Sequence, residues 1–210
     1  MAPLASPPAD LPGLQILARD PLLYVIDGFA SDAECDALLA AARSRLEPPL
    51  VSRSEMEHDP SVRTGQLAWL AWSEFPAVEA YCARVARLVG WPLDDAESLQ
   101  VVRYLPGQRY QAHYDAYDQS DPAGRSCLQE HGQRFVTTLT YLHEPDAGGA
   151  TTFDRLGLAI PPRRGQLVAF ADVGADPTRP HPDSLHAGAP VEAGVKWMAA
   201  LWFRRPLPGA

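Results

Sequence analysis

A change of hydrophobic period near residue 99 most constrains the fold of this 210-residue chain. Before it, the segments 31–46 and 76–90 carry apolar side chains at helical spacing. Ser31 with Glu34 is a helix-start signal for the first segment, and Gly90 is a stop signal for the second. After residue 99 the apolar runs are short and β-rich, and Pro-Gly, Gly-Gly and Pro-Pro pairs separate them. This order predicts a small helical layer packed on a β-sandwich or jelly roll.

The length of the chain suits one domain behind a short tail. Residues 1–13 are rich in Pro and Ala, and we expect them to form a flexible tail. Residues 14–210 then form a single domain, with a helical support over 14–98 and a jelly-roll core over 99–205. The 21 prolines and 15 glycines predict many turns and argue against a helical bundle.

Charge and composition exclude several classes of function. A net charge of −8 disfavours a nucleic-acid partner, because proteins that bind nucleic acids usually present a basic face. Cys35, Cys82 and Cys127 are odd in number and far apart, which predicts buried thiols rather than a disulfide framework. The N-terminal segment has neither the basic nor the apolar region of a signal peptide, and no apolar run is long enough for a membrane span. We therefore expect a cytoplasmic protein.

The stretch QRYQAHYDAYDQSD, residues 108–121, places His113 and Asp115 one residue apart. In a strand, side chains at this spacing point to the same face, so the imidazole and the carboxylate converge. With one more histidine they would complete the 2-His-1-carboxylate set that binds non-haem Fe(II). On these two residues alone, a surface His–Asp pair without a ligand is the simpler interpretation.

A second His-x-Asp pattern, at His181 and Asp183, serves as an internal comparison. Pro182 lies between them and removes a strand hydrogen-bond donor, which predicts a turn. No later strand could supply a distant third ligand, so we reject this pair as the centre of a site. His186, which precedes another apolar run, is the better candidate for the third ligand of His113 and Asp115.

The run VKWMAALWF, residues 195–203, is apolar on both alternating faces, which predicts a strand buried on both sides. Lys196 at its start is costly to bury unless the ammonium group meets an anion. The alternative, on this residue alone, is that Lys196 reaches solvent from the end of the strand. The remaining histidines, His58, His131 and His143, lie in polar loops or at a strand end and are weak ligand candidates.

Taken together, His113-x-Asp115, His186 and Lys196 resemble the Fe(II)/2-oxoglutarate dioxygenases, and more narrowly the prolyl 4-hydroxylase catalytic-domain family. The supporting phrases, in chain order, are LQVVRYLPGQRYQAHYD, GQRFVTTLTYL, GGATTF, PRRGQLVAF and SLHAGAPVEAGVKWMAALWFR. More loosely, VSRSE and VRTGQ resemble the substrate-side loop of the family. The resemblance covers residues 99–205 and implies an α+β, mainly β fold: a double-stranded β-helix, or jelly roll, with the N-terminal helices packed on one sheet.

The resemblance implies a metal site and a cosubstrate site. The implied Fe(II) ligands are His113, Asp115 and His186. 2-Oxoglutarate would chelate the metal, Lys196 would pair with its far carboxylate, and Tyr104 and Thr151 would donate hydroxyl hydrogen bonds to it. O2 would take the remaining metal position, ascorbate would act as reductant, and succinate and CO2 would accompany hydroxylation of an unactivated C–H. Related halogenases lack the carboxylate ligand, so Asp115 favours hydroxylation.

On the substrate side, the resemblance implies a role for Arg134, and Tyr110 and Tyr117 flank the ligand strand and would line an entry groove. The segments 115–133 and 52–69 are long enough to act as lids. A prolyl residue in an extended peptide or protein would suit an aromatic groove.

Two departures from the family leave the substrate open. The segment GQLAWLAWSEF is unusually rich in tryptophan, and Asp172 stands where an aromatic or apolar residue is more typical. They keep a free or carrier-bound amino acid possible as the substrate. A non-catalytic metal-binding jelly roll is the third alternative, but such a module has no need of a buried Lys196. A nucleic-acid demethylase is disfavoured by the acidic charge and by Lys in place of Arg. The sequence does not predict an oligomeric state.

Overall fold

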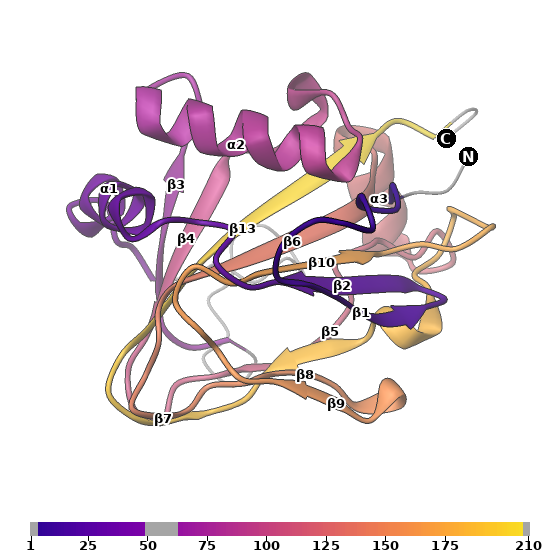
Figure 1. The fold of residues 1–210 in the computed structure, drawn as a ribbon. Helices are drawn as coiled ribbons and strands as arrows, with labels where there is room; N and C mark the ends of the chain where they lie inside the picture. The colour runs from indigo at the N-terminus through magenta and orange to yellow at the C-terminus, as the bar shows by residue number, and fades with distance from the viewer. Residues whose placement is uncertain (1–3, 49–62, 208–210) are drawn as a thin grey trace.

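The structure is a computed structural model that describes residues 4–48 and 63–207. Two antiparallel sheets face each other, and helices α1 and α2 cover the outer face of the larger sheet while the smaller sheet lies beneath it (Figure 1). The predicted jelly roll with helices packed on one sheet is therefore confirmed. The helices are α1 (Asp32–Arg43), α2 (Pro76–Val89) and α3 (Pro122–His131), with short 3₁₀ helices η1 (Leu93–Asp95), η2 (Asp154–Leu156) and η3 (Pro182–Ser184).

The two sheets differ in size. The larger has seven strands in the order β1 (Leu14–Arg19), β2 (Leu22–Ile26), β10 (Leu167–Ala171), β6 (Gln133–His143), β13 (Lys196–Arg205), β4 (Leu99–Tyr104) and β3 (Gln66–Leu70). The smaller has four, in the order β5 (Tyr110–His113), β11 (His186–Gly188), β8 (Thr151–Phe153) and β9 (Leu158–Ile160). Strands β12 (Val191–Ala193) and β7 (Ala147–Gly148) form a separate two-stranded ladder.

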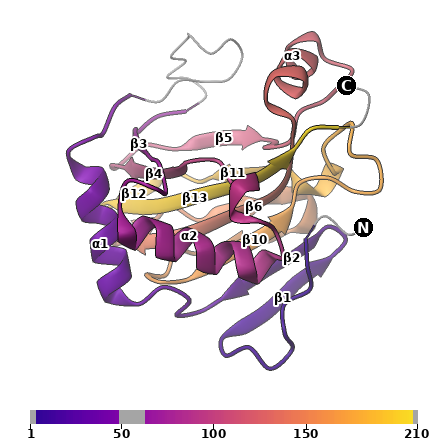
Figure 2. The ribbon, with the colours of Figure 1, turned by 90° about the horizontal axis from the view of Figure 1, so that it is seen from above.

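The helical layer begins and ends where the sequence predicts. The Glu34 backbone N–H donates to Ser31 Oγ at 3.3 Å, and the Ser31 backbone N–H donates to Glu34 Oε2 at 2.9 Å, which forms the capping box of α1. Gly90 ends α2 with φ of 75°, a left-handed conformation that glycine adopts without strain. Seen from above, α1 and α2 lie over the same face of the larger sheet (Figure 2). Cys35 and Cys82 are buried in this layer, as predicted.

A second core fills the space between the two sheets. Alternate residues of each strand point into it, as the pleat requires. In β6, Leu139 and Tyr141 face the smaller sheet, whereas Val136 and Leu142 pack under the helices. The other buried members of this inner core are Leu23, Val25, Phe153, Ile160, Val168, Phe170, Ala200 and Trp202. These side chains separate the sheets and leave room for a site near one end of the space.

Three elements differ from the expectations. Helix α3 forms inside segment 115–133, which we expected to be a loop, because Asp121 accepts a hydrogen bond from the Gly124 backbone N–H at 3.3 Å and Pro122 suits the first turn. Strands β1 and β3 also escaped prediction. Together with β2 they show that residues 14–98 supply three strands of the larger sheet, as well as a helical support.

Part of the expected N-terminal tail is packed. Leu4 is only 2% exposed within the helical core, and the Ala5 backbone N–H donates to Val89 O at 3.3 Å. Leu4 joins the helical core and Ala5 is bonded to the end of α2, which the composition of the segment does not indicate. Of the second expected lid, 52–69, residues 52–62 with His58 and VSRSE lie outside the described residues. None of the helices in the described ranges has the length and apolar character needed to span a bilayer.

Candidate metal centre and cosubstrate pocket

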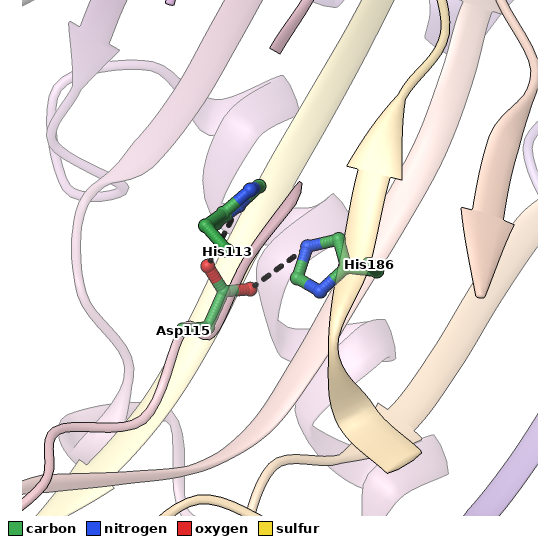
Figure 3. A group of neighbouring side chains, drawn as sticks. All are labelled: His113, Asp115 and His186. Carbon is green, nitrogen blue, oxygen red and sulfur yellow. Dashed lines mark ion pairs between the residues drawn. The ribbon is translucent and has the colours of Figure 1, made fainter. Parts of the chain in front are cut away.

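Strands β5 and β11 bring two histidines together from distant parts of the chain. β5 ends at His113 and β11 begins at His186, and the antiparallel register pairs these two residues directly. Their ring centroids are 4.3 Å apart. Asp115 lies in the turn that follows β5, and its carboxylate points toward the rings of His113 and His186 (Figure 3).

The three side chains face one point. Asp115 Oδ1 lies 3.5 Å from His113 Nε2, and Oδ2 lies 3.6 Å from His186 Nε2. One ligand atom from each residue lies within 4.8 Å of the others, and the described residues contain no other group of this kind. Two imidazoles and one carboxylate on one side of a common point are the donor set of a facial Fe(II) site, so these residues fit that metal.

Backbone carbonyls hold both imidazoles in the orientation that a metal ligand needs. His113 Nδ1 donates to Gln111 O at 2.8 Å, and His186 Nδ1 donates to Ser184 O at 3.0 Å. Each Nε2 lone pair is therefore free to face the common point. Burial, with a further contribution from the neighbouring His113, lowers the pKa of His186 to about 4, so its imidazole is neutral at neutral pH.

Asp115 is an ionised carboxylate in a buried position. Burial alone would raise its pKa, but the adjacent His186 and His113 rings and Arg134 outweigh burial and hold the pKa well below its ordinary value. The side chain is 6% exposed. A buried carboxylate beside two imidazole nitrogens is a suitable environment for a divalent cation.

The rejected pair, His181 and Asp183, forms the expected turn. His181 Nδ1 accepts a hydrogen bond from the Asp183 backbone N–H at 3.1 Å at the start of η3. His181 Nε2 lies 3.3 Å from Asp20 Oδ1, and the Asp20 side chain is 91% exposed. The two side chains therefore do not converge on a ligand position.

Lys196 opens β13 opposite Tyr104 of β4 and is 2% exposed. Its Nζ donates to Gly149 O at 2.6 Å. Burial lowers the pKa of Lys196 to about 7, and burial is the only cause of this shift. Within the part of the chain that the structure describes, no carboxylate compensates this cation. Lys196 therefore points a desolvated cation into the interior with room for an anionic partner.

Hydroxyl groups surround the Lys196 end. The Tyr141 hydroxyl donates to Thr151 Oγ1 at 2.7 Å, so the hydrogen of Thr151 Oγ1 is available for another acceptor. Lys196 Nζ lies 5.8 Å from the Tyr104 ring centroid and 5.2 Å from that of Tyr141. Tyr141 escaped the sequence analysis, although its place two residues after the inward-facing Leu139 is a signal that could have found it.

One cavity joins the two ends. Its lining includes every expected metal and cosubstrate residue: His113, Asp115, His186, Lys196, Tyr104 and Thr151. The wall between the ends is largely apolar and includes Leu139, Met198, Ala200 and Trp202. An apolar cavity with a few polar groups at its two ends suits a small dicarboxylate.

Tyr110 also lines the cavity, as expected for a residue near the substrate. Its ring stacks on His113 with a centroid separation of 3.6 Å, and burial raises the pKa of its hydroxyl to about 12. Arg63 and Gln100 were missed by the sequence analysis. The Arg63 guanidinium lies 4.7 Å above the Tyr110 ring, and its Nη2 donates to Gln100 Oε1 at 2.5 Å. Arg63 precedes β3 and reaches Tyr110 through an isolated antiparallel bridge between distant parts of the chain, so no local pattern marks this contact.

Arg134 and Tyr117 lie behind the cavity wall. Arg134 forms a two-pronged ion pair with Glu97, at 2.6 Å from Nε to Oε1 and 2.9 Å from Nη2 to Oε2. Its guanidinium lies 4.3 Å from the Trp202 ring centroid and 5.6 Å from that of Tyr117. Trp202 lines the cavity, whereas Arg134 and Tyr117 are not among the lining residues. Glu97 therefore holds the Arg134 guanidinium behind Trp202, and the substrate contacts expected of Arg134 and Tyr117 stay predictions.

The fold and the site define a known class of enzyme. Residues 99–204 match the family model described as the 2OG-Fe(II) oxygenase superfamily, which covers the expected core almost residue for residue. Fe(II) and 2-oxoglutarate are thus the metal and the cosubstrate of this dioxygenase, in keeping with its His–Asp–His group.

Relatives narrow the class. The chain is 33% identical over 181 residues to a protein of Acanthamoeba polyphaga mimivirus named "Putative prolyl 4-hydroxylase". The alignment covers 86% of this chain and 73% of that protein. It is 29% identical over 210 residues to prolyl 4-hydroxylase 2 of Arabidopsis thaliana, and the alignment covers 89% of this chain and 68% of that protein. Among solved structures, the 2OG complex of the viral collagen prolyl hydroxylase vCPH from Paramecium Bursaria Chlorella virus-1 superposes on this chain with a TM-score of 0.69 and 31% sequence identity. The superposition covers 87% of this chain and 95% of that chain. The chain belongs to the prolyl 4-hydroxylase family.

Proposed function

We propose that this protein hydroxylates a prolyl residue of a peptide or protein, with 2-oxoglutarate as cosubstrate. The observation that carries the proposal is the single cavity with a His–Asp–His group at one end and the unpaired cation of Lys196 at the other. The relatives named as prolyl 4-hydroxylases, including a collagen prolyl hydroxylase, support the choice of a peptidyl proline.

In the proposed site, His113, Asp115 and His186 hold Fe(II). The bound metal supplies the oxidation of a C–H by O2, coupled to conversion of 2-oxoglutarate into succinate and CO2. Lys196 Nζ pairs with the far carboxylate of the cosubstrate, which compensates the buried cation. Tyr104 and Thr151 donate hydroxyl hydrogen bonds to the same carboxylate, and Tyr141 orients the Thr151 hydroxyl.

The aromatic side chains prepare the substrate side. Tyr110 and Trp202 line the cavity beside the metal ligands, and an aromatic lining suits a pyrrolidine ring and helps to keep water out. Arg134, held by Glu97, supports the back of Trp202 rather than contacting the substrate. A reductant role for ascorbate rests on the family resemblance alone, and a cytoplasmic location rests on the sequence alone.

A substrate panel tests the proposal. Protein supplied with Fe(II), 2-oxoglutarate and ascorbate is incubated with proline-containing peptides, with matched peptides in which Ala replaces Pro, and with free amino acids. We expect succinate release and the mass gain of one oxygen atom on a peptidyl proline only. Turnover of free amino acids alone would support the small-metabolite alternative, and folded protein that releases no succinate with any substrate would contradict the proposal. His181→Ala is the active control variant, and His186→Ala is the inactive one.

A further inference from the structure

A buried acid lies next to the metal centre, and no cation among the described residues forms an ion pair with it. Asp172 directly follows β10 and is 0% exposed. Its two carboxyl oxygens lie 3.0 and 2.9 Å from Thr137 Oγ1. The same Thr137 oxygen lies 2.8 Å from Asp115 Oδ2. One hydroxyl group therefore links Asp172 to the carboxylate of the proposed metal ligand.

The number of hydrogens fixes the direction of this link. The Thr137 hydroxyl can donate one hydrogen bond, and two carboxyl groups face it. Two ionised acids would compete for one hydrogen in a buried space, which is strongly unfavourable. A carboxyl group binds a metal ion in its deprotonated form, so Asp115, as the proposed ligand, carries no hydrogen and Asp172 supplies the second one. Asp172 thus donates to Thr137, and Thr137 donates to Asp115 Oδ2.

The backbone of Asp172 is tied to the other side of the metal centre. Its carbonyl oxygen accepts hydrogen bonds from the His181 backbone N–H at 2.8 Å and from Ser184 Oγ at 3.2 Å. The carbonyl oxygen of Ser184 in turn accepts from His186 Nδ1 at 3.0 Å. One residue therefore supports the turn that orients His186 and, through its side chain, the orientation of Asp115.

We propose that Asp172 is a positioning residue of the metal centre, a hydrogen-bond donor that fixes the Thr137 hydroxyl on Asp115 and so holds the carboxylate ready for the metal. The inference rests on the proposed role of Asp115 as a metal ligand and deepens it. Loss of a group that orients a ligand typically weakens metal affinity by about 10- to 100-fold, so the effect is measurable without turnover.

Anaerobic Co(II) titration followed by visible absorption measures this effect without catalysis. Asp172→Leu has a similar size but no hydrogen-bonding group, and we expect it to bind Co(II) about 10-fold more weakly, with a changed spectrum. Asp172→Asn keeps the shape and an N–H donor, so its affinity should stay within about threefold of the unaltered protein. Thr137→Val removes the link itself and should weaken binding by up to about 100-fold.

A control variant separates positioning from general loss of packing. The Tyr81 hydroxyl donates to Thr140 Oγ1 at 2.6 Å within the helical core, on the other face of the larger sheet. Tyr81→Phe removes this buried hydrogen bond, so it should lower the melting temperature without changing Co(II) affinity. In the double variant Thr137→Val/Asp172→Leu, affinity should be no lower than in Thr137→Val, because Asp172 acts through Thr137.

Three results would overturn the inference. They are unchanged Co(II) affinity and spectrum in folded Asp172→Leu, equal weakening by Asp172→Asn and Asp172→Leu, and additive losses in the double variant. If the unaltered, folded protein itself fails to bind Co(II), the proposed metal site is wrong and the inference fails with it. Normal Co(II) binding with an unaffected Asp172→Leu would contradict the inference alone and leave the proposed function standing.

Discussion

The two ends of the cavity are built in opposite ways. At the metal end, the side chains come from the neighbouring strands β5 and β11 of the smaller sheet and from the turn after β5, and carbonyl groups and Thr137 orient them. At the other end, Lys196 lies in an inner strand of the larger sheet, where its buried charge is the main recognition group and the hydroxyl groups of Tyr104 and Thr151 add to it. Loss of one ligand at the metal end should therefore abolish activity. Loss of one group at the Lys196 end should only weaken the binding of 2-oxoglutarate.

The largest expected effect is the loss of activity when one metal ligand is replaced. Replacing His113, Asp115 or His186 by Ala should reduce succinate formation to the level without enzyme, because two remaining ligands do not hold the metal in place. His181→Ala should retain near-normal activity, since its ring faces Asp20 at the surface. If His181→Ala were inactive and His186→Ala active, the choice between the two His-x-Asp regions would be wrong.

At the Lys196 end we expect weaker binding of 2-oxoglutarate rather than complete loss of activity. Lys196→Met tests this, because it keeps the apolar stem and removes the charge. A hydrogen bond to a charged group contributes about 1.5–3 kcal/mol, so the KM for 2-oxoglutarate should rise roughly 10- to 150-fold. At saturating 2-oxoglutarate, kcat should change by only a few-fold, because no metal ligand is lost. Steady-state kinetics with 2-oxoglutarate varied would separate the two parameters, and an unchanged KM would argue against this role.

The pH dependence follows from the same lysine. With its pKa lowered to about 7 by burial, Lys196 in the free protein is protonated below that pH and neutral above it. The dicarboxylate binds the protonated form, so its affinity should be highest below pH 7 and fall by roughly tenfold per pH unit above it, until the pKa of the complex is reached.

Calorimetry with Co(II) in place of Fe(II) checks this sign, because binding near pH 8 should take up a proton and the heat should vary with the buffer. Arg stays protonated throughout this range, so Lys196→Arg should bind with no such pH dependence. Affinity that rises with pH in the unaltered protein would contradict a charged Lys196 as the anion partner.

The smallest effect concerns a single hydroxyl at the Lys196 end. Tyr104→Phe removes one neutral hydrogen bond, which contributes about 1 kcal/mol, and should raise the KM for 2-oxoglutarate roughly fivefold. Tyr24→Phe is a matched control, because the buried Tyr24 hydroxyl has no hydrogen-bond partner in the described residues. Its KM should not change. If the KM for 2-oxoglutarate rose as much in Tyr104→Phe as in Lys196→Met, the charge of Lys196 would not be the main recognition group.

The sequence was most informative where the signal is local. The Ser31–Glu34 pair and Gly90 predicted the start of α1 and the end of α2, since caps depend on residues within a few positions. The His113-x-Asp115 spacing predicted a shared direction, and Pro182 marked the rival pair as a turn. Helix α3 was missed because it is short and its start, Asp121-Pro122, also suits a turn.

Contacts between distant strands could not be predicted from such patterns. Sequence alone determined the start of α1, the end of α2, the class of fold and, through the resemblance, which residues could serve iron and 2-oxoglutarate. Only the tertiary structure set His113 opposite His186, turned Arg134 toward Glu97 and placed Asp172 on Thr137. The physical reason is that side-chain direction is a local property of the backbone. Which side chains meet depends on the register of strands that pair only after the chain has folded.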